Sequence, residues 1–294
     1  MAKRQDFTGW SALVTGGAGG LGRAIAKRLI ERGIRCLLVD INPAGLGRAV
    51  EALGPMATLY EADLTDPAAR ERLVQHVRDR WGRLDVLINN AGIVGTKPFE
   101  QRAHESIREE LELNLIAPIL LTHSLLPLLQ SAGDGRVVSI VSLGGMFPLP
   151  ETSVYSASKF GLRGAMLCLG LDGQRLGLRF SIVNPSATET PMLMREAIHG
   201  GNKLQFMDPP QMPDEVALQV MRCLDKPCLE RFVRTSESWT VRLAMLLPNM
   251  LARALPLFRR SAERGHQRYL ASLVERGLVR QQGGEWELIS DHRP

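Results

Sequence analysis

The sequence predicts an α/β fold in which a doubly wound parallel sheet carries helices on both faces, giving three layers. Short and almost wholly apolar runs alternate along the chain with stretches of helical periodicity, and the first apolar run ends in a cluster of glycines. Strands that read as continuous Val, Ile and Leu runs are buried on both faces, so they need helices above and below the sheet. With right-handed crossovers between parallel strands, a Rossmann-like sheet is expected.

The predicted elements follow one another at regular intervals. The first apolar run, residues 10–15, leads into the glycine cluster, and a helical pattern over residues 21–30 stops at Gly33. The order of strand, turn and helix then repeats, with further strands expected at residues 36–40, 57–61, 85–89, 136–141, 179–183 and 231–235. A long helix is expected over residues 153–176.

Length and composition set limits on the class of protein. The chain has 294 residues, of which 45% are hydrophobic, so it can bury a substantial core. We expect a single domain over residues 1–235 and a tail over residues 236–294. No apolar run precedes Trp10, so no secretory signal is indicated and a cytoplasmic protein is expected. No metal site is expected, because the cysteines lie at no metal-ligand spacing: Cys36, Cys168, Cys223 and Cys228.

The net charge of +5 is located in the C-terminal part of the chain. Residues 231–294 contain 11 arginines and 6 acidic residues, which leaves residues 1–230 neutral. A basic chain invites a nucleic-acid partner, but the sequence has no recognition motif and no basic stripe interleaved with aromatic residues. We therefore expect no nucleic-acid partner.

A glycine-rich turn joins the first strand to the first helix. Residues 15–22 read Thr-Gly-Gly-Ala-Gly-Gly-Leu-Gly. Missing Cβ atoms at this place let a pyrophosphate approach the backbone amides and the helix N-terminus. Two spacings fit the run, and either one indicates a dinucleotide: Gly17, Gly19 and Gly22, or Gly16, Gly20 and Gly22.

The second predicted strand ends in a carboxylate. Asp40 lies 18 residues beyond Gly22, where it can accept hydrogen bonds from the adenosine ribose and repel a 2′-phosphate. This position favours NAD over NADP, and no arginine or lysine within the glycine run attracts a phosphate. The same aspartate can instead cap the helix that opens at Pro43, a role compatible with ribose binding.

Tyr155 and Lys159 are four residues apart, which places both side chains on one face of a helix. An ammonium within about 4–6 Å favours a phenolate and lowers the pKa of a tyrosine from about 10. General acid–base catalysis uses such a group. The same spacing also occurs as a surface pair on ordinary helices.

The chain resembles the short-chain dehydrogenase/reductase family over roughly residues 9–235. The resemblance rests on five motifs in this order: residues 15–22, Asn89-Asn90-Ala91-Gly92, Ser142, Tyr155 and Lys159. It implies that Tyr155 exchanges a proton with the substrate oxygen while hydride moves to or from the nicotinamide. Lys159 would lower the Tyr155 pKa and hold the nicotinamide ribose, and Ser142 would bond the substrate oxygen.

Asn114 matches the asparagine that supports a water-mediated proton path to the lysine in this family. An asparagine within an apolar helix is costly unless it has partners, which gives this role a physical motive. A structural cap or bend near Pro118 is the alternative.

The resemblance implies further contacts to the dinucleotide. They fall in the glycine turn and after the second, third, fourth and sixth strands: Gly16, Gly20, Leu21 and Gly22; Asp40 at the ribose; Asp63 and Leu64 at the adenine; Asn90, Ala91 and Gly92 beside the adenosine ribose; Thr188 and Thr190 at the carboxamide. Asn89 is expected to stabilise the sheet. Two departures stand out, since Pro185-Ser186 replaces the usual Pro-Gly and the Asp-Gly-Gly segment after the last strand is absent.

The resemblance places residues 191–225 as the loop and helices that cover the substrate. The first part of this segment is rich in methionine and contains one phenylalanine: Met192, Met194, Met207, Met212 and Phe206. Flexible thioethers suit an adaptable apolar pocket, and plain core filling explains them equally well.

The tail, residues 236–294, reads as a basic amphipathic helical extension. Apolar residues recur with a helical period between residues 239 and 260, flanked by Arg242, Arg253 and Arg260. The uncharged run over residues 243–252 is shorter than the ~20 residues needed to span a bilayer. Three roles remain open for residues 239–260: a lid, a subunit contact, or a peripheral contact with a membrane surface.

We therefore expect an NAD-dependent oxidoreductase that interconverts a secondary alcohol and a ketone, on a steroid-like or other apolar substrate. A reductase of a 3-oxoacyl thioester or a related carbonyl is the alternative among enzymes. A catalytically silent dinucleotide sensor or scaffold is the alternative from another class. The resemblance also implies a homo-oligomer, a dimer or a tetramer.

Overall fold

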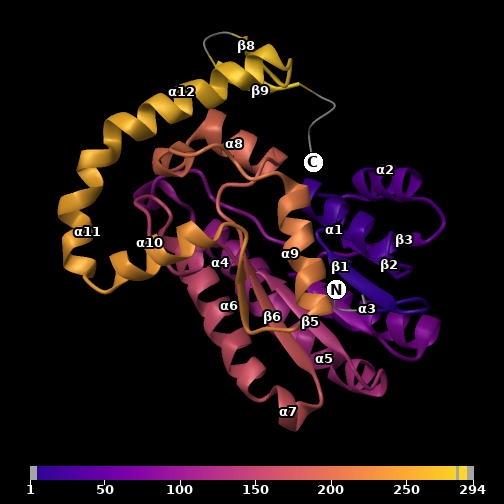
Figure 1. The fold of residues 1–294 in the computed structure, drawn as a ribbon. Helices are drawn as coiled ribbons and strands as arrows, with labels where there is room; N and C mark the ends of the chain where they lie inside the picture. Colours follow the sequence, from indigo (N-terminus) through magenta and orange to yellow (C-terminus); the bar gives the residue numbers. More distant parts are fainter. Residues whose placement is uncertain (1–4, 283–284, 290–294) are drawn as a thin grey trace.

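A seven-stranded parallel sheet forms the centre of the computed structural model (Figure 1), in the order β3-β2-β1-β4-β5-β6-β7. The structure describes residues 5–282 and 285–289. Residues 1–4, at the start of the segment considered for a secretory signal, lie outside the described residues, as do residues 283–284 and 290–294 of the tail. The strands are β1 Ser11–Thr15, β2 Arg35–Asp40, β3 Ala57–Glu61, β4 Val86–Asn89, β5 Arg136–Ile140, β6 Arg179–Asn184 and β7 Glu230–Phe232.

Helices cover both faces of this sheet. Successive side chains of a strand point to opposite faces, so Leu13 of β1 belongs to one apolar core while Ala12 and Val14 belong to the other. The core around Leu13 is covered by α3 Pro67–Trp81, α5 Ala117–Ser131 and α6 Ser153–Leu171. The second core is covered by α1 Gly20–Ile30, α2 Pro43–Leu53 and α9 Pro213–Asp225. The predicted three-layer, doubly wound fold is confirmed.

The burial of the central strands explains their sequences. Every residue of β1, β4 and β5 is buried, and these strands carry almost no charged side chain. The expected helix over residues 153–176 ends earlier, at Leu171, and a single turn, α7 Gly173–Leu176, follows it. Because all strands are parallel, their carboxyl ends meet at one edge, with the switch in strand order between β1 and β4.

One long helical run crosses a face of the sheet. It consists of α4 His104–Leu111, a π-helical segment Glu112–Ile116 and α5, and it is long and apolar enough to cross a membrane by length and composition. Leu121, Leu125 and Leu129 of this run are buried in the core against the sheet. We therefore interpret the run as a core helix.

The C-terminal part of the chain forms an arc around the outside of α8 Pro191–His199 (Figure 1). It comprises α10 Thr235–Met245, α11 Pro248–Ala254, the 3-10 turn Leu255–Phe258 and α12 Arg259–Glu275, followed by an antiparallel hairpin of β8 Val279–Gln282 and β9 Glu285–Leu288. The sequence analysis did not predict this hairpin. The chain is bent by 106° between α10 and the run that begins with α11, so the two are not one straight span.

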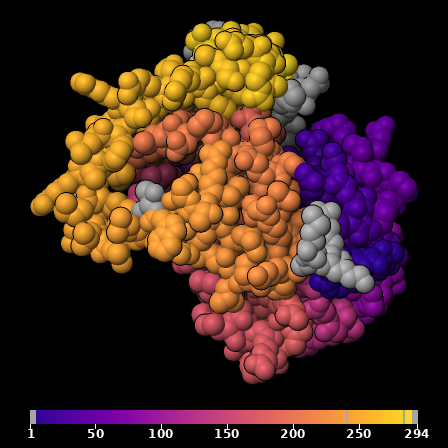
Figure 2. Space-filling view, in the orientation of Figure 1, coloured from indigo at the N-terminus to yellow at the C-terminus, as the bar shows by residue number. Residues whose placement is uncertain are grey.

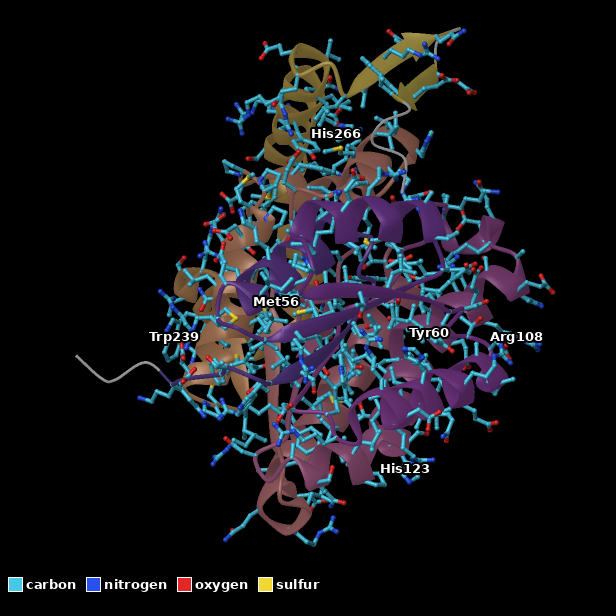
Figure 3. The ribbon with its side chains drawn as sticks, turned by 90° about the vertical axis from the view of Figure 1, so that its right-hand side faces the viewer. Met56, Tyr60, Arg108, His123, Trp239 and His266 are labelled. Atoms are coloured by element: carbon cyan, nitrogen blue, oxygen red, sulfur yellow. The ribbon has the colours of Figure 1, made fainter. Side chains whose placement is uncertain are left out.

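The far end of the arc is joined to the rest of the molecule by a third apolar core. Tyr269, Leu270 and Leu273 of α12 pack there with Leu193 and Met194 of α8. His266 of α12, labelled in Figure 3, shares a 2.8 Å hydrogen bond with the Ala197 carbonyl oxygen. In the space-filling view of Figure 2, α11 lies at one edge of the molecule, and α10 leads from the body to it.

Candidate active site

The glycine turn packs so closely that two of its glycines admit no side chain. Gly16 has a φ of 66°, in the left-handed region, and a Cβ built on Gly22 would lie 2.1 Å from the Gly16 carbonyl oxygen. Gly20 and Leu21 open α1, and no protein atom lies closer than 3.7 Å to a Cβ built on Gly20. Gly20 therefore has room for a methyl group in ordinary contact with Thr190 and Pro191.

The N-terminus of α1 offers amide groups to an anion. Gly19 occupies the N-cap position and makes no side-chain hydrogen bond, and the first turn of the helix contains no acidic residue. The first amides of a helix lack partners within the helix and lie at the positive end of its dipole. This end of α1 fits the pyrophosphate of a dinucleotide.

Asp40, at the end of β2, lies beside the glycine turn. Its carboxylate accepts hydrogen bonds from the amides of Ala18, at 3.0 Å, and Asn42, at 3.1 Å. Asn42, not Asp40, caps α2 by accepting a hydrogen bond from the Gly45 amide. The helix-cap alternative for Asp40 is therefore wrong. Each carboxylate oxygen keeps acceptor capacity for a ribose hydroxyl.

The segment after β4 is fastened to the glycine turn. The Asn90 side chain donates to the Thr15 carbonyl oxygen at 2.8 Å, and the Thr15 hydroxyl accepts from the amides of Asn90 and Ala91. Asn89 instead donates to the hydroxyl of Ser139 on the neighbouring strand β5 and to the hydroxyl of Thr122 on α5. The side chain of Asn89 is thus used by the sheet, as expected, and Asn90 and Ala91 lie at the turn.

Asp63 and Leu64 follow β3, farther from the glycine turn. Asp63 accepts hydrogen bonds from the amide and the hydroxyl of Thr65, so its carboxylate shapes its own turn. Leu64 is buried and lines a small cavity together with Thr15 and Ala91. The structure therefore brings Leu64, more than Asp63, toward the other predicted residues.

Ser142, Tyr155 and Lys159 converge on one place between β5 and α6. A Cβ built on Gly144 would lie 3.1 Å from the Tyr155 ring and 3.4 Å from the Ser142 Oγ. The Lys159 Nζ lies 5.7 Å from the centroid of the Tyr155 ring and donates a 3.2 Å hydrogen bond to the Ile140 carbonyl oxygen. The phenol, the hydroxyl and the ammonium are therefore close neighbours.

The surroundings shift the pKa of Tyr155 in the direction opposite to the one expected from the lysine alone. Loss of hydration raises the pKa of the Tyr155 phenol, the negative charges of Glu196 and Glu110 add to the rise, and a hydrogen bond with Ser142 counters it. Burial lowers the pKa of Lys159 to about 8. The expectation of a lowered Tyr155 pKa is wrong here, because desolvation outweighs an ammonium that is directed at the Ile140 carbonyl.

Asn114 is fully buried and has its polar atoms paired. Its side-chain oxygen accepts from the Ile93 amide at 2.9 Å, and its amide donates to the Ile93 carbonyl at 2.8 Å and to the Ser158 hydroxyl at 3.2 Å. A Cβ built on Gly92 would lie 3.0 Å from the Asn114 Oδ1 and 3.6 Å from the Lys159 Nζ. Asn114 thus fixes the segment after β4 beside the lysine.

The backbone at Asn114 is irregular. Asn114 lies in the π-helical segment, and Pro118 has no N–H to donate to the Asn114 carbonyl at the usual helical spacing. Single π-helical turns are frequent at functional sites. The irregular backbone near Pro118 and the buried polar contacts of Asn114 therefore lie at the same point of the helical run.

The segment after β6 reaches back to the glycine turn. Thr190 caps α8, and its methyl group would lie 3.7 Å from a Cβ built on Gly20. Thr188 donates to the Ser186 carbonyl at 3.0 Å. Ser186, which replaces the usual glycine, is held by Gln211 and Glu237 through hydrogen bonds of 3.2 Å each.

Two carboxyl groups near the site, buried Glu110 and half-buried Glu196, were not predicted from the sequence. Glu110 is fully buried and forms an ion pair with Arg102, and its charge acts on both Tyr155 and Lys159. Glu196 of α8 has its pKa raised to about 7, chiefly by burial. The only signal in the sequence that could have identified Glu110 was its position, four residues before Asn114 on the same helical run.

The methionine-rich segment that was expected to cover the substrate, residues 191–225, places some of its apolar side chains in the core and others at the surface. Met194 and Phe206 are buried in the third apolar core, whereas Met212 is 55% exposed at the start of α9. Core filling thus explains Met194 and Phe206. Met192 and Met207 are half-buried.

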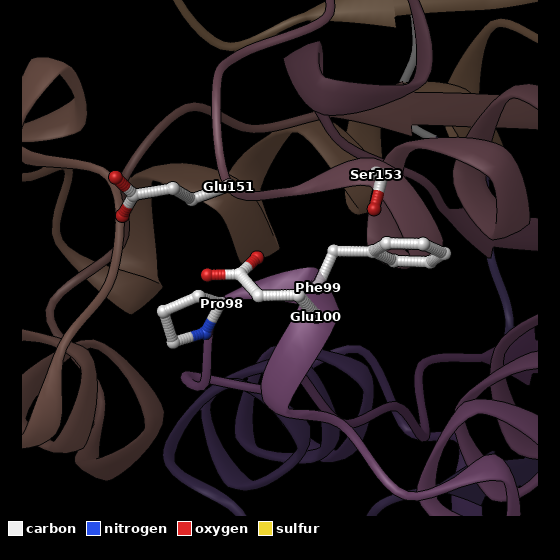
Figure 4. A pocket seen from close by; sticks show the side chains of 5 residues that line it. All are labelled: Pro98, Phe99, Glu100, Glu151 and Ser153. Carbon is white, nitrogen blue, oxygen red and sulfur yellow. The ribbon is translucent and has the colours of Figure 1, made fainter.

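A hollow of about 550 Å³ opens beside the N-terminus of α6 (Figure 4), two residues from Tyr155. The hollow is lined by Pro98, Phe99, Glu100, Glu151 and Ser153. In Figure 4, Phe99 and Ser153 lie on one side of it, and the carboxylates of Glu100 and Glu151 lie on the other. Among the residues that the structure describes, no group of three or more His, Cys, Asp or Glu side chains could hold a metal ion.

Comparisons with known proteins agree with this geometry. A family model described as short chain dehydrogenase matches residues 11–199. Levodione reductase from Leifsonia aquatica is 33% identical over 222 residues, which cover 73% of this chain and 80% of that protein. Cyclohexanol dehydrogenase from Acinetobacter sp. is 29% identical over 215 residues, which cover 72% of this chain and 86% of that protein.

A solved structure matches most of the fold. The 3-ketoacyl-(acyl-carrier-protein) reductase from Brucella melitensis, complexed with NADH, is similar with a TM-score of 0.68 at 26% sequence identity, covering 77% of this chain and 98% of that one. The family match spans more than half of the chain and includes the glycine turn, Ser142, Tyr155 and Lys159. The chain therefore belongs to the short-chain dehydrogenase family of oxidoreductases.

Proposed function

We propose that the protein is an NAD-dependent oxidoreductase that interconverts a secondary alcohol and a ketone. The convergence of Ser142, Tyr155 and Lys159 between β5 and α6 carries this proposal. When bound, a nicotinamide dinucleotide supplies or accepts the hydride. The glycine turn and the uncapped N-terminus of α1 would hold its pyrophosphate.

Each polar side chain of the site would have a separate role in proton transfer. With its pKa raised, the Tyr155 phenol keeps its proton at neutral pH and can donate it to a carbonyl oxygen. In the oxidative direction Tyr155 must accept the alcohol proton, and the Ser142 hydrogen bond and the Lys159 ammonium would stabilise the phenolate formed. Asn114 would hold the segment after β4 in place beside Lys159.

The preference for NAD over NADP is supported by the residues around Asp40. The carboxylate would meet the 2′-position of the adenosine ribose, where a phosphate would be repelled. The residues around this place carry no positive charge: Ala18, Ile41 and Asn42. This choice of cofactor favours the oxidative direction.

An apolar substrate is supported by the site and by one relative's name. Met146 is buried next to the turn that follows Ser142, and half-buried Met192 lies on the covering helix. A relative named cyclohexanol dehydrogenase acts on a cyclic alcohol, and we propose a lipophilic, ring-containing or steroid-like alcohol here. The test is NAD reduction by the purified protein over a panel of cyclic alcohols, sterols, long-chain alcohols and polyols.

A substitution completes this test. Tyr155→Phe keeps the ring and removes the exchangeable proton, so we expect turnover of the best alcohol to fall at least about 100-fold while NAD still binds. Turnover near the wild-type level would contradict the mechanism. Preference for polyols over cyclic and long-chain alcohols would contradict the proposed substrate class.

Two alternative functions can be tested by defined assays. The structural similarity to a 3-ketoacyl-(acyl-carrier-protein) reductase favours reduction of a 3-oxoacyl thioester as the second candidate, and assays with NADH and NADPH on such a thioester separate it from the first. A catalytically silent dinucleotide sensor would bind NAD and turn over no member of either panel. The convergence of Asn114, Ser142, Tyr155 and Lys159 speaks against such a sensor.

A homo-oligomer in the cytoplasm, a dimer or a tetramer, completes the proposal. Apolar side chains on the outer side of the long helices lack cover in the single chain: Ile116 and Leu120 beside and on α5, and Phe160 on α6. Such a row of partly exposed apolar residues suits a subunit interface. Sedimentation velocity with the full chain measures the number of subunits.

A further inference from the structure

The outer face of α10 and α11 exposes a continuous row of apolar side chains. Trp239, Leu243, Leu246, Leu247 and Met250, here called the apolar stripe, are 68%, 70%, 73%, 65% and 52% exposed. Trp239 lies at the edge of the molecule in Figure 3. Single exposed apolar residues are ordinary on soluble proteins, whereas a contiguous group of this size marks an interaction surface.

The apolar stripe follows helical spacing on each side of the bend between α10 and α11. Trp239 and Leu243 are four residues apart on α10, Leu247 and Met250 are three residues apart beside and on α11, and Leu246 and Leu247 lie where the two helices join. Among the described side chains of α11 and of the following 3-10 turn none is buried, and Leu257 in that turn is 80% exposed. This part of the chain therefore contributes little to the core of its own fold.

The charges beside the apolar stripe are of one sign. Residues 238–262 contain four arginines and no acidic residue. Arg242 pairs with Glu230 at 3.5 Å, but Arg253, Arg259 and Arg260 are exposed and form no ion pair within the part of the chain that the structure describes. Three arginines are therefore available to an anionic partner.

We propose that residues 239–260 dock on the surface of an anionic lipid bilayer. The apolar stripe would enter the boundary between headgroups and acyl chains, and Arg253, Arg259 and Arg260 would bind the headgroup phosphates. Amphipathic segments that are rich in arginine and carry tryptophan and leucine bind membranes in this way. The aromatic ring of Trp239 suits the same boundary, because it is apolar with one polar N–H.

The charge pattern favours a bilayer over a second copy of the chain. In a twofold-symmetric interface both copies contribute the same patch, so the three unpaired arginines of each copy would be gathered in one interface. No acidic residue within residues 238–262 offsets this repulsion. An anionic lipid surface supplies the missing negative charge without any such conflict.

A position at the membrane surface would also suit an apolar substrate, a consequence that rests on the proposed function. The arc continues from the apolar stripe into α12, and α12 packs on α8, which carries Glu196 toward Tyr155. The covering helix of the site is therefore linked to the membrane-facing segment through well-packed side chains. A lipophilic alcohol dissolved in the bilayer would meet the protein on this side.

Cosedimentation of the full-length protein with lipid vesicles tests the docking without any catalytic readout. We expect binding to vesicles of phosphatidylcholine mixed with phosphatidylserine, weak binding to phosphatidylcholine alone, and weaker binding as salt is raised. The triple variant R253Q/R259Q/R260Q should lose about 100-fold in affinity for the anionic vesicles. The matched control R35Q/R48Q/R108Q removes the same charge from exposed positions elsewhere and should bind as the wild type does.

A second variant tests the apolar stripe. L243S/L246S/L247S should fail to bind anionic vesicles while retaining all its arginines, and it should keep a cooperative unfolding transition because these residues are exposed. Equal binding by the wild type and both variants would overturn the proposal, as would absence of binding to anionic vesicles at low salt. Dissociation of an oligomer by L243S/L246S/L247S, with no vesicle binding by the wild type, would assign the surface to a second copy instead.

Discussion

The glycine turn makes its strongest prediction at Gly22, where a substitution should disturb the fold itself. A Cβ at this position would lie 2.1 Å from the Gly16 carbonyl oxygen, 2.9 Å from the Gly16 carbonyl carbon and 3.0 Å from the Gly17 Cα. All three atoms belong to backbone, so no side chain can turn aside. Gly22→Ala must therefore push the turn and α1 apart, and we expect it to lower the free energy of unfolding by about 3 kcal/mol.

Gly20 and Gly47 provide matched comparisons. Gly20→Ala adds a methyl group that meets no protein atom closer than 3.7 Å, so its stability should stay within about 0.5 kcal/mol of wild type. The methyl group would occupy the place proposed for the pyrophosphate, and the affinity for NAD should fall at least about 10-fold. Gly47→Ala, in exposed α2 with nothing within 4 Å, should gain about 0.5–1 kcal/mol and leave NAD binding unchanged.

Urea unfolding and calorimetric titration with NAD separate these outcomes. Wild-type stability of Gly22→Ala would refute the close packing between the turn and α1. Unchanged NAD affinity of a stable Gly20→Ala would refute the glycine turn as the dinucleotide site. Because the two variants lie two residues apart in one turn, general damage to the region cannot produce opposite results in the two assays.

Three further predictions follow from buried or paired charges. Asp40→Ala should reduce the ratio of kcat/KM with NAD to kcat/KM with NADP by at least about 10-fold, and an unchanged ratio would contradict the ribose assignment. Lys159 releases its proton near a pKa of about 8 in the folded protein and near 10.5 when unfolded. The unfolded chain thus binds more protons at Lys159 between these values, so the contribution of Lys159 to the free energy of unfolding should rise by about 3 kcal/mol from pH 8 to 10.5, measured in urea as the difference between the wild type and Lys159→Met. Arg102→Gln leaves the fully buried Glu110 unpaired and should cost about 3 kcal/mol, part of which Glu110→Gln in the same chain should restore.

Local patterns explain why the sequence predicted most of the fold. The central strands β1, β4 and β5 are short runs buried on both faces, the glycine turn follows directly after β1, and Asp40 is the last residue of β2. The carboxyl ends of parallel strands share one edge of the sheet, so residues that follow different strands are brought together by topology alone. The end of β5 places Ser142 at this edge, whereas the roles of Ser142 and Tyr155 were inferred from the resemblance to the family.

Contacts between distant segments could not be predicted in the same way. The pairing of Asn114 with Ile93 depends on how the helical run crosses the sheet, and no local pattern encodes it. The direction of the Tyr155 pKa shift likewise depends on burial and on Glu196, which lies 41 residues away in the sequence. The spacing of Tyr155 and Lys159 predicted their common face but not the dehydration that dominates the titration.

The packing of the tail decides which experiment can reveal its role. Gly265 of α12 lies so close to the turn before α9 that a Cβ would stand 2.0 Å from the Phe206 carbonyl oxygen, and Arg276 pairs with Glu189 at 2.8 Å. Deleting residues 236–294 would therefore uncover α8 and remove much of the third apolar core along with the apolar stripe. Loss of activity after such a deletion is expected from the damaged cover of the site, whether or not the protein binds a membrane. The point variants at residues 243–260 change exposed side chains and leave the packed residues of α12 in place, so a loss of vesicle binding in them reports the membrane contact alone.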